Sequence, residues 1–297
     1  MVPGPAITFS IPYYSGIEYL GKAIESILAQ DDDSWAAVVA DDSSEAGVED
    51  YVKRVGGGRV RYEKNPKNLG IDGNFNRSID LAETELVTVF HADDELMPNY
   101  ASTMRRAADR HPRAAALFCR ASIIGPESQS WFSLADYVKR FINPAQSKEF
   151  VLEGEPGLRS LLRANFIMAP TLCFRKSVLG ERRFPLGYKF VLDWELTTSL
   201  LLDGESLIGI PDICYRYRRH FANMTEKLSK TQQRFREESA FYDRMREKTH
   251  ALGWTKCEEI AREKRIFKLN IAYRALKSAA QLQLGDVRKG IQLLREL

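Results

Sequence analysis

Short apolar runs alternate with amphipathic segments over residues 6–90 of the chain. The runs are rich in β-branched and aromatic residues, as buried strands are, and the segments between them place apolar side chains at helical spacing. Because strands that alternate with helices form parallel sheets covered by helices on both faces, this alternation predicts an α/β fold. The expected strands are 6–11, 35–40, 60–62 and 86–90, and the expected helices are 17–28, 50–55 and 71–82. The second half is less regular: a long excursion is expected over 125–150, a helix over 188–202, and strands over 206–210 and 213–217.

Acidic residues follow two of these expected strands directly. Asp41 and Asp42 come after the second strand, and His91, Asp93 and Asp94 come after the fourth. The carboxyl ends of parallel strands meet at one edge of a sheet, where open α/β folds bind their ligands. Crowded carboxylates repel one another unless water or a cation compensates their charge. Two interpretations stay open at this point: a divalent cation that holds a phosphate, and a solvated turn.

The sequence lacks the signals of several protein classes. It has no GxGxxG and no GxxxxGK[ST] pattern, which counts against an NAD-binding or Walker-type phosphate loop. No apolar run approaches the ~20 residues needed to cross a bilayer, and no signal peptide is recognisable. The four cysteines form no CxxC pair, so neither a zinc site nor a disulfide framework is expected. These features predict a cytoplasmic protein, and no nucleic-acid partner is expected.

The C-terminal part of the chain has a different character. Residues 226–297 read as helical and carry 17 Lys/Arg and 10 Asp/Glu, a net charge of +7, whereas the whole chain has +3. An anionic neighbour such as a membrane surface would explain this charge, and so would a solvated helical face. An apolar stripe at helical spacing over 266–276 is wide enough to pack on the body of the protein or on another subunit. Peripheral membrane contact and a homodimer through these helices are both open.

Six motifs occur in a fixed order along the chain: SIPYYSGIEYLGKAIESILAQ, VVADDSS, NLGIDGNFNRS, VTVFHADDEL, LDWEL and YRYRRH. This ordered set resembles the family 2 glycosyltransferases over residues 6–225. The resemblance implies a GT-A fold, a Rossmann-like mixed sheet flanked by helices, for residues 1–225. Residues 1–97 would form the half that binds a nucleotide-sugar and residues 98–225 the half that binds the acceptor. Residues 226–297 would be a helical C-terminal extension.

The resemblance also implies a set of residues for the nucleotide. Asp41 would accept a hydrogen bond from a base N–H, and because an ionised carboxylate only accepts, it would select a base such as uracil and favour a UDP-sugar. His91 and Ala92 occupy the first two positions of the family's DxD motif, and His91 replaces the usual Asp. The other residues expected near the nucleotide are Pro12, Tyr14, Asn68, Gly70 and Asn74.

The metal ligands and the general base follow from the same resemblance. Asp93 would bind Mg²⁺ or Mn²⁺ at the donor diphosphate, and His220 would be a further metal ligand. Asp193 matches the last Asp of the family's ED motif and would be the general base, with Leu192 in place of the usual Glu. A helix cap is the alternative role for Asp193. The phosphate would also be contacted by Arg218 or Arg219.

The acceptor site is expected at residues 166–171, which include Ala169 and Pro170, with Trp194 or Trp131 as a stacking face or as core. The implied activity is that of an inverting, metal-dependent hexosyltransferase that acts on a saccharide or lipid-linked hydroxyl in polysaccharide, glycolipid or other glycoconjugate biosynthesis. A non-catalytic nucleotide-sugar-binding relative is the alternative, because His91 and Leu192 depart from the family pattern. A nucleotidyltransferase is less favoured, because residues 13–16 hold no basic residue for a triphosphate.

Overall fold

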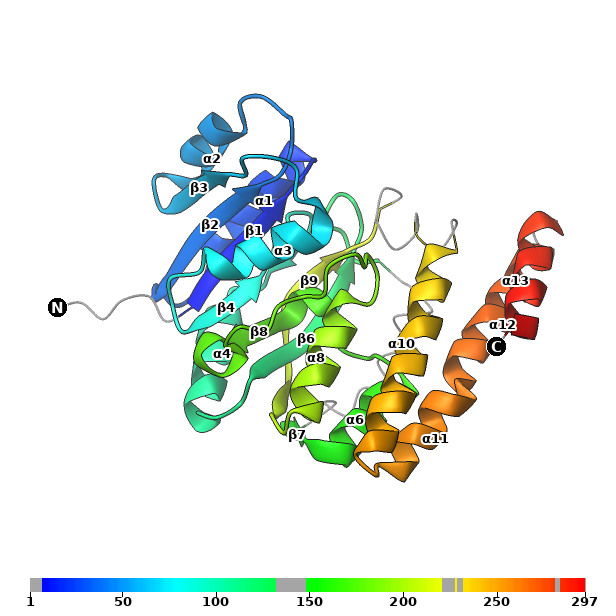
Figure 1. The fold of residues 1–297 in the computed structure, drawn as a ribbon. Helices are drawn as coiled ribbons and strands as arrows, with labels where there is room; N and C mark the ends of the chain where they lie inside the picture. Colours follow the sequence, from blue (N-terminus) through cyan, green and yellow to red (C-terminus); the bar gives the residue numbers. More distant parts are fainter. Residues whose placement is uncertain (1–6, 132–147, 221–227, 229–231, 281–283, 297) are drawn as a thin grey trace.

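The structure is a computed structural model that describes residues 7–131, 148–220, 228, 232–280 and 284–296. Strands and helices alternate in its first half and helices dominate its end (Figure 1). The strands are β1 Ile7–Tyr13, β2 Trp35–Asp41, β3 Val60–Lys64, β4 Leu86–Val89, β5 Glu95–Leu96, β6 Ala116–Ile124, β7 Phe150–Leu152, β8 Leu172–Arg175 and β9 Leu207–Arg218. The helices are α1 Ile17–Leu28, α2 Val48–Gly56, α3 Gly70–Asp80, α4 Tyr100–Arg110, α6 Gly154–Arg163, a 3-10 turn η1 Ala169–Thr171, α7 Lys176–Leu179, α8 Leu192–Leu202, α10 Gln233–Ala251, α11 Thr255–Glu263, α12 Arg265–Ala280 and α13 Leu284–Glu296.

One mixed sheet runs through the molecule in the order β3-β2-β1-β4-β8-β6-β9-β5, with β7 paired to β9. The first four strands in this order are all parallel, as the alternation in the sequence predicts. The antiparallel strand β8 then joins β4 to β6. The expected mixed sheet flanked by helices is therefore confirmed, and the parallel part of it carries the acidic strand ends.

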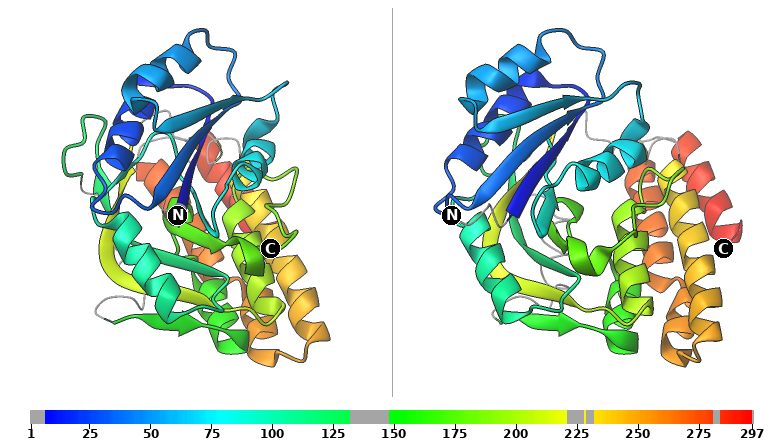
Figure 2. Two further views of the ribbon diagram at one scale, coloured as in Figure 1. Left: turned by 90° about the vertical axis from the view of Figure 1, so that its left-hand side faces the viewer. Right: turned by 60° about the vertical axis from the view of Figure 1, so that its left-hand side comes forward.

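Helices cover both faces of the sheet (Figure 2). Buried apolar side chains of α1, α2 and α4 form one core with the first face of the sheet. Side chains of α3, α6, α8 and α10 form a second core with the other face. This explains why α8 is apolar around most of its circumference: it lies between the sheet and α10, so both of its sides are buried.

Two details of the second half differ from the sequence-based expectation. Residues 206–210 and 213–217 read as two strands, but they form one long strand, β9, whose pairing with β6 shifts register near Arg120. Pro211 made the two segments look separate in the sequence. In the structure, a shift in the register of the β6–β9 pairing accommodates this proline. The predicted helix over 188–202 begins only at Leu192. The long excursion expected over 125–150 lies mostly outside the described residues.

The C-terminal helices belong to the same core as the sheet. The ring of Trp194 on α8 stacks on Phe241 of α10 with centroids 4.1 Å apart. The hydroxyl of Tyr242 donates to the carbonyl of Leu162 on α6. The predicted boundary at residues 225 and 226 falls outside the described residues. Among the described helices, none is both long enough and apolar enough to cross a bilayer.

Replacing Phe241 with Ala is expected to lower the free energy of unfolding by about 3–5 kcal/mol, because it opens a cavity against Trp194. Since α10 and the sheet share one core, unfolding should stay a single transition in urea, followed by fluorescence and circular dichroism. The control is Leu252→Ala, at an exposed position just after α10. A variant in which α10 melts separately while the sheet keeps its midpoint would show that the extension is an independent unit.

Candidate active site

A pocket of about 450 Å³ lies at the carboxyl ends of β1, β2 and β3. Its walls come from the segments that directly follow these strands, and they include Tyr14, Asp42, Lys64 and Asn68. Parallel strands that end side by side create this depression, because their connections turn away in different directions. Tyr14 and Asn68, two residues expected near the nucleotide, thus both line this pocket. Pro12 is the second-to-last residue of β1 and pairs with Ala40 of β2.

The structure shows protein groups around Asp41, which is expected to accept a hydrogen bond from the base. Its carboxylate is fully buried and accepts hydrogen bonds from the backbone N–H of Ser43, the hydroxyl of Tyr62 and the ammonium of Lys64, at 2.7, 2.6 and 2.9 Å. Burial raises the pKa of Asp41, but these hydrogen bonds outweigh burial and hold the pKa below its ordinary value. Asp41 therefore ties β2 to β3, and its neighbour Asp42 lines the pocket.

Asp42 also shapes the loop over residues 65–70. Its carboxylate accepts the backbone N–H groups of Leu69 and Gly70, at 2.8 and 3.0 Å, and the side-chain amide of Asn68 donates to its carbonyl oxygen. Gly70 has φ of +75°, and a Cβ atom there would lie 3.3 Å from Oδ1 of Asp72, so another residue would strain the turn. The predicted Asn68 and Gly70 thus lie in a loop that Asp42 fastens to the pocket.

Asn74, which is also expected near the nucleotide, makes contacts within the protein. Its side chain is 3% exposed and donates to the carbonyl of Ala40 at 3.0 Å, and it accepts a hydrogen bond from Asn65. A second contact reaches the carbonyl of Tyr13 at 3.4 Å. Because both functional ends of the amide are engaged with protein groups, Asn74 joins the ends of β1 and β2 and does not face the pocket.

The acidic cluster follows β4, the strand next to β1. His91, Asp93 and Asp94 each offer a ligand atom, and these atoms lie within 4.8 Å of one another. The ring of His91 packs against Phe75 of α3 with centroids 5.3 Å apart, which fixes its place beside the acids. Nε2 of His220, just beyond β9, lies 2.9 Å from Oδ2 of Asp93. The structure therefore brings together the two residues that the sequence proposes as metal ligands, although 127 positions separate them.

Burial and charge set the protonation of this cluster. Burial opposes ionisation of Asp93, yet its hydrogen bond to His220 and the nearby His91 hold its pKa below the ordinary value. Asp94 has its pKa raised well above the ordinary value, first by burial and then by the charge of Asp93. Burial lowers the pKa of His91 against the pull of Asp93, which favours the neutral imidazole that can ligate a metal ion. Carboxylate and neutral imidazole donors fit Mn²⁺, and the carboxylates fit Mg²⁺.

Arg218, which with Arg219 is one of two residues expected to contact the phosphate, organises the acidic turn. Its side chain is completely buried and pairs with Glu95, and its Nε donates to the carbonyl of Asp93 at 2.7 Å. Its backbone N–H donates to Oδ1 of Asp94 at 2.7 Å, and the Tyr215 hydroxyl donates to Oδ2 at 2.9 Å. The guanidinium therefore holds the acidic turn from behind. The antiparallel pairing of β5 with β9 creates this contact, and no local pattern indicates it.

Asp193 lies in the first turn of α8. The N-cap of this helix is Val191, so the capping role left open for Asp193 is not the one observed. The side-chain amide of Asn165 donates to Oδ2 of Asp193 at 3.2 Å. Just before the helix, the backbone N–H groups of Lys189 and Phe190 donate to the buried carboxylate of Glu237, at 3.0 and 2.7 Å. Glu237 of α10 thus holds the segment that leads into α8, the helix that carries Asp193.

The segment expected at the acceptor lies beside the acidic cluster. Antiparallel pairing matches Thr88 of β4 with Cys173 of β8, so η1, which precedes β8, runs along the end of β4. Ala169 is half-buried and Pro170 is buried in this turn. Trp194, in contrast, is 5% exposed and stacks on Phe241, so its ring offers no open face for a sugar. Trp131 is exposed.

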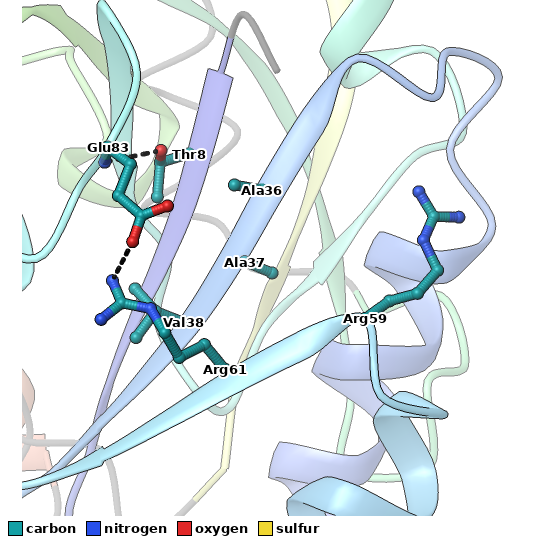
Figure 3. Close-up of a pocket in the computed structure, with 7 residues that line it drawn as sticks. All are labelled: Thr8, Ala36, Ala37, Val38, Arg59, Arg61 and Glu83. Carbon is teal, nitrogen blue, oxygen red and sulfur yellow. Dashed lines mark hydrogen bonds and ion pairs between the residues drawn. The ribbon is translucent and has the colours of Figure 1, made fainter. Parts of the chain in front are cut away.

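A second pocket, of about 150 Å³, opens on the sheet face near the amino ends of the same strands. Thr8, Ala36 and Arg61 line it, and Figure 3 shows Arg61 paired with Glu83, whose backbone N–H donates to Thr8. Its charged residues are therefore already neutralised, and it lies away from the strand ends that carry the acidic cluster. The larger pocket is the candidate donor site.

Comparison with known proteins identifies the family. A model of the family described as "Glycosyl transferase family 2" matches residues 8–177, which is more than half of the chain. The chain belongs to this family. The matched range includes the larger pocket, the acidic cluster and η1, and it ends before Asp193.

Family 2 relatives and solved structures agree with this assignment. The chain is 32% identical over 108 residues to the GalNAc(5)-diNAcBac-PP-undecaprenol beta-1,3-glucosyltransferase of Campylobacter jejuni, and 31% identical over 105 residues to the succinoglycan biosynthesis protein ExoO of Rhizobium meliloti. The matches cover 35% of this chain in both cases, and 35% and 30% of those proteins, so the chain spans about a third of their length.

Two solved structures show the fold. TarS residues 1–349 of S. aureus, in complex with UDP-GlcNAc, has a TM-score of 0.61 at 16% identity, covering 80% of this chain and 66% of TarS. The mannosyltransferase PcManGT of Pyrobaculum calidifontis, in complex with GDP-Man and Mn²⁺, has a TM-score of 0.61 at 17% identity, covering 99% of this chain and 83% of PcManGT. At this identity the likeness establishes the GT-A fold of this family 2 protein.

Proposed function

We propose that this family 2 glycosyltransferase moves a sugar from a UDP-sugar to a hydroxyl group with inversion at the anomeric carbon. The observation that carries the proposal is the pairing of Asp93 with His220 beside Asp94, at the carboxyl end of β4. This cluster follows the strand next to β1, whose end borders the 450 Å³ pocket. A nucleotide in that pocket would therefore direct its diphosphate toward the cluster.

Residues in the walls of the larger pocket would recognise the nucleobase. Tyr14 offers an exposed ring for stacking, and Asp41 or its neighbour Asp42, at the end of β2, would offer a carboxylate that only accepts hydrogen bonds. Uracil presents an N–H donor to such a group. Among the solved relatives of this fold, TarS binds UDP-GlcNAc and PcManGT binds GDP-Man. The choice of UDP over GDP is therefore part of the proposal and is decided by the experiment below.

Asp93 and His220 would hold Mg²⁺ or Mn²⁺ together with the donor diphosphate, and Asp94 would lie behind them. Such an ion, when bound, neutralises the charge that develops on the leaving diphosphate. Arg218 keeps the acidic turn in place through its contacts with Asp93, Asp94 and Glu95. His91 packs between Phe75 and the acids and would contact the donor sugar or ribose.

Asp193 would act as the general base. Its carboxylate would take the proton from the acceptor hydroxyl as the oxygen forms a bond to the anomeric carbon, while the bond from that carbon to the diphosphate breaks on the opposite side. Asn165 supports this role because its side-chain amide donates a hydrogen bond to Oδ2 of Asp193. Asn165 also precedes η1, which runs along the end of β4. The acceptor would lie between η1 and α8.

The acceptor class is proposed from the relatives. The Campylobacter jejuni protein is named for a polyprenyl-diphosphate-linked acceptor, and ExoO is named for the biosynthesis of a polysaccharide. A saccharide or lipid-linked hydroxyl is accordingly the proposed acceptor of this chain. Residues 166–171 are the proposed contact region, with Ala169 at its accessible side.

Thermal unfolding with nucleotides tests the donor site. UDP with Mn²⁺ is expected to raise Tm, because a ligand that binds only the folded state adds about 2.7 kcal/mol at one hundred times its Kd. GDP and dTDP should raise Tm less, and EDTA should abolish the effect of all three. If GDP stabilises more than UDP, the proposed base is wrong, and if no nucleotide stabilises, the pocket is not a donor site.

The alternative is a nucleotide-sugar-binding relative without transfer activity. It is motivated by His91, which stands where the family usually has Asp, and by Leu192, which stands where it usually has Glu. Such a protein would show the Tm increase with UDP and Mn²⁺ but no transfer to any member of a panel of saccharide and lipid-linked acceptors. Transfer to one acceptor excludes this alternative.

A further inference from the structure

Helix α10 of the C-terminal extension packs beside α8, the helix that carries Asp193 (Figure 1). Glu237 of α10 is 8% exposed. Its Oε2 atom accepts hydrogen bonds from the backbone N–H groups of Lys189, Phe190 and Val191, at 3.0, 2.7 and 3.4 Å. Val191 is the N-cap of α8. Because N–H groups bind a charged carboxylate more strongly than a neutral acceptor, one side chain of α10 fixes the whole approach to this helix.

Two further contacts fasten the first turns of α8 to α10. Phe241 stacks on Trp194, the residue directly after Asp193. Arg244 pairs with the buried Glu195, and its Nε donates to Oε1 of that carboxylate at 2.8 Å. Together with the hydrogen bonds before the helix, these contacts reach the chain on both sides of Asp193. The position of this residue is therefore tied to α10.

A general base depends on its position, because it must lie within hydrogen-bond reach of the proton that it removes. Asp193 is half-buried, and Asn165 contacts one of its two oxygens. We infer that Glu237 is a positioning residue for Asp193, because it holds the backbone from which this side chain extends. The inference rests on the proposed function and adds a residue to it. It places part of the site's support outside residues 8–177, which the family model matches.

The surroundings of Glu237 allow its hydrogen bonds to be removed and restored by mutation. Glu237→Ala removes the acceptor of all three N–H groups. Glu237→Gln keeps one oxygen to face them, and its NH₂ group then faces Gln233, whose amide donates to Oε1 of Glu237 at 2.9 Å. A flip of the Gln233 amide would turn an acceptor toward this new donor. Gln should therefore restore the contact that Ala removes.

Transfer kinetics of the full chain, measured well below the Tm of each variant, test the inference. Glu237→Ala is expected to lower kcat by about 10–100-fold, because a small displacement of a catalytic group is costly. The KM for the donor and the Tm increase with UDP and Mn²⁺ should stay unchanged, since the donor pocket lies at the ends of β1, β2 and β3. Glu237→Gln should keep most of the parent kcat. The control Asp243→Ala removes another carboxylate of α10, which pairs with Lys264 at 2.9 Å, and should leave kcat unchanged.

A double-mutant cycle separates positioning from a general loss of structure. Once the base is absent its position no longer matters, so Glu237→Ala should not lower the residual rate of Asp193→Asn any further. Equal effects of Glu237→Ala in both backgrounds would overturn the inference, and so would an unchanged kcat in Glu237→Ala alone. If Asp193→Asn keeps full activity, the proposed base is wrong and Glu237 has no base to position.

Amide hydrogen exchange reads the contact without any activity. Exchange over residues 188–196, followed by mass spectrometry, should be faster in Glu237→Ala than in the parent, because local opening becomes easier. Glu237→Gln should restore the parent exchange, and Asp243→Ala should not change it. Unchanged exchange in Glu237→Ala contradicts the inference even where transfer is lost. Faster exchange in a chain whose parent glycosylates no acceptor would show that the proposed function fails, and the role of Glu237 at the base fails with it.

Discussion

Replacing Asp193 with Asn is expected to lower kcat by about 10²–10⁴-fold, the contribution that a general base typically makes. The amide has almost the same shape as the carboxylate, but it cannot take the proton from the acceptor hydroxyl. Because Asp193 lies outside the pocket that would hold the base, the Tm increase with nucleotide and Mn²⁺ should remain. Initial rates of sugar transfer, measured with saturating donor, check the prediction.

The control for this prediction lies on the same helix. Asp203→Asn makes the same chemical change at the end of α8, where the carboxylate pairs with Arg182 on the surface. Its kcat should stay within about twofold of the parent, because a surface ion pair contributes little to stability. Full activity of Asp193→Asn would remove Asp193 from the mechanism. Loss of nucleotide binding in that variant would show that Asp193 instead supports the donor site.

The local pattern of the sequence predicts the first half of the fold well. Strands β1 to β4 are joined through helices and pair in parallel in the order β3-β2-β1-β4, and each can be recognised from its own apolar run. The positions of the acids after β2 and β4 follow from the same runs. Asp93 and His220 are brought together as the family resemblance implies, since β9 runs beside β6 and pairs with β5 just after the acids.

Three assignments needed the three-dimensional structure. Asp41 and Asp42 are neighbours, and only the pairing of β2 with β3 shows that the first is enclosed by Tyr62 and Lys64 while the second lines the pocket. Trp194 could be surface or core by its spacing, and the packing of α10 against it decides for the core. In each case a contact between distant segments overrides the local pattern.

The role of Arg218 could not be predicted from its charge either. A basic residue near the candidate phosphate site is expected to bind phosphate because of its charge. The guanidinium of Arg218 instead pairs with Glu95 and donates hydrogen bonds to the carbonyls of Gly125 and Pro126. A buried ion pair of this kind is costly to break. Its partners come from distant segments, so the charge of Arg218 alone does not show where its guanidinium binds. The site therefore has a supporting residue that motif matching assigned to the substrate.

Replacing Asp93 with Asn is expected to remove the metal dependence of nucleotide binding and to lower the transfer rate by about 10²-fold or more, because an amide is a far weaker ligand for a hard cation than a carboxylate. The fold should survive, since the side-chain amide can still contact His220 and the backbone carbonyl of residue 93 still accepts from Arg218. Tm with UDP, measured with and without Mn²⁺, and initial rates of transfer check the two parts.

The matched control is Asp109→Asn, at an exposed position of α4, which should leave both the Mn²⁺ effect and the rate unchanged. His220→Asn separates the two proposed ligands: if both hold the ion, each variant should weaken the Mn²⁺ effect, and Asp93→Asn should weaken it more, because removing a carboxylate also removes the negative charge that attracts the cation. A variant at residue 93 that keeps the full Mn²⁺ effect would place the metal elsewhere. A metal effect that survives in both variants would leave Asp93 and His220 as an ion pair that supports the acidic turn.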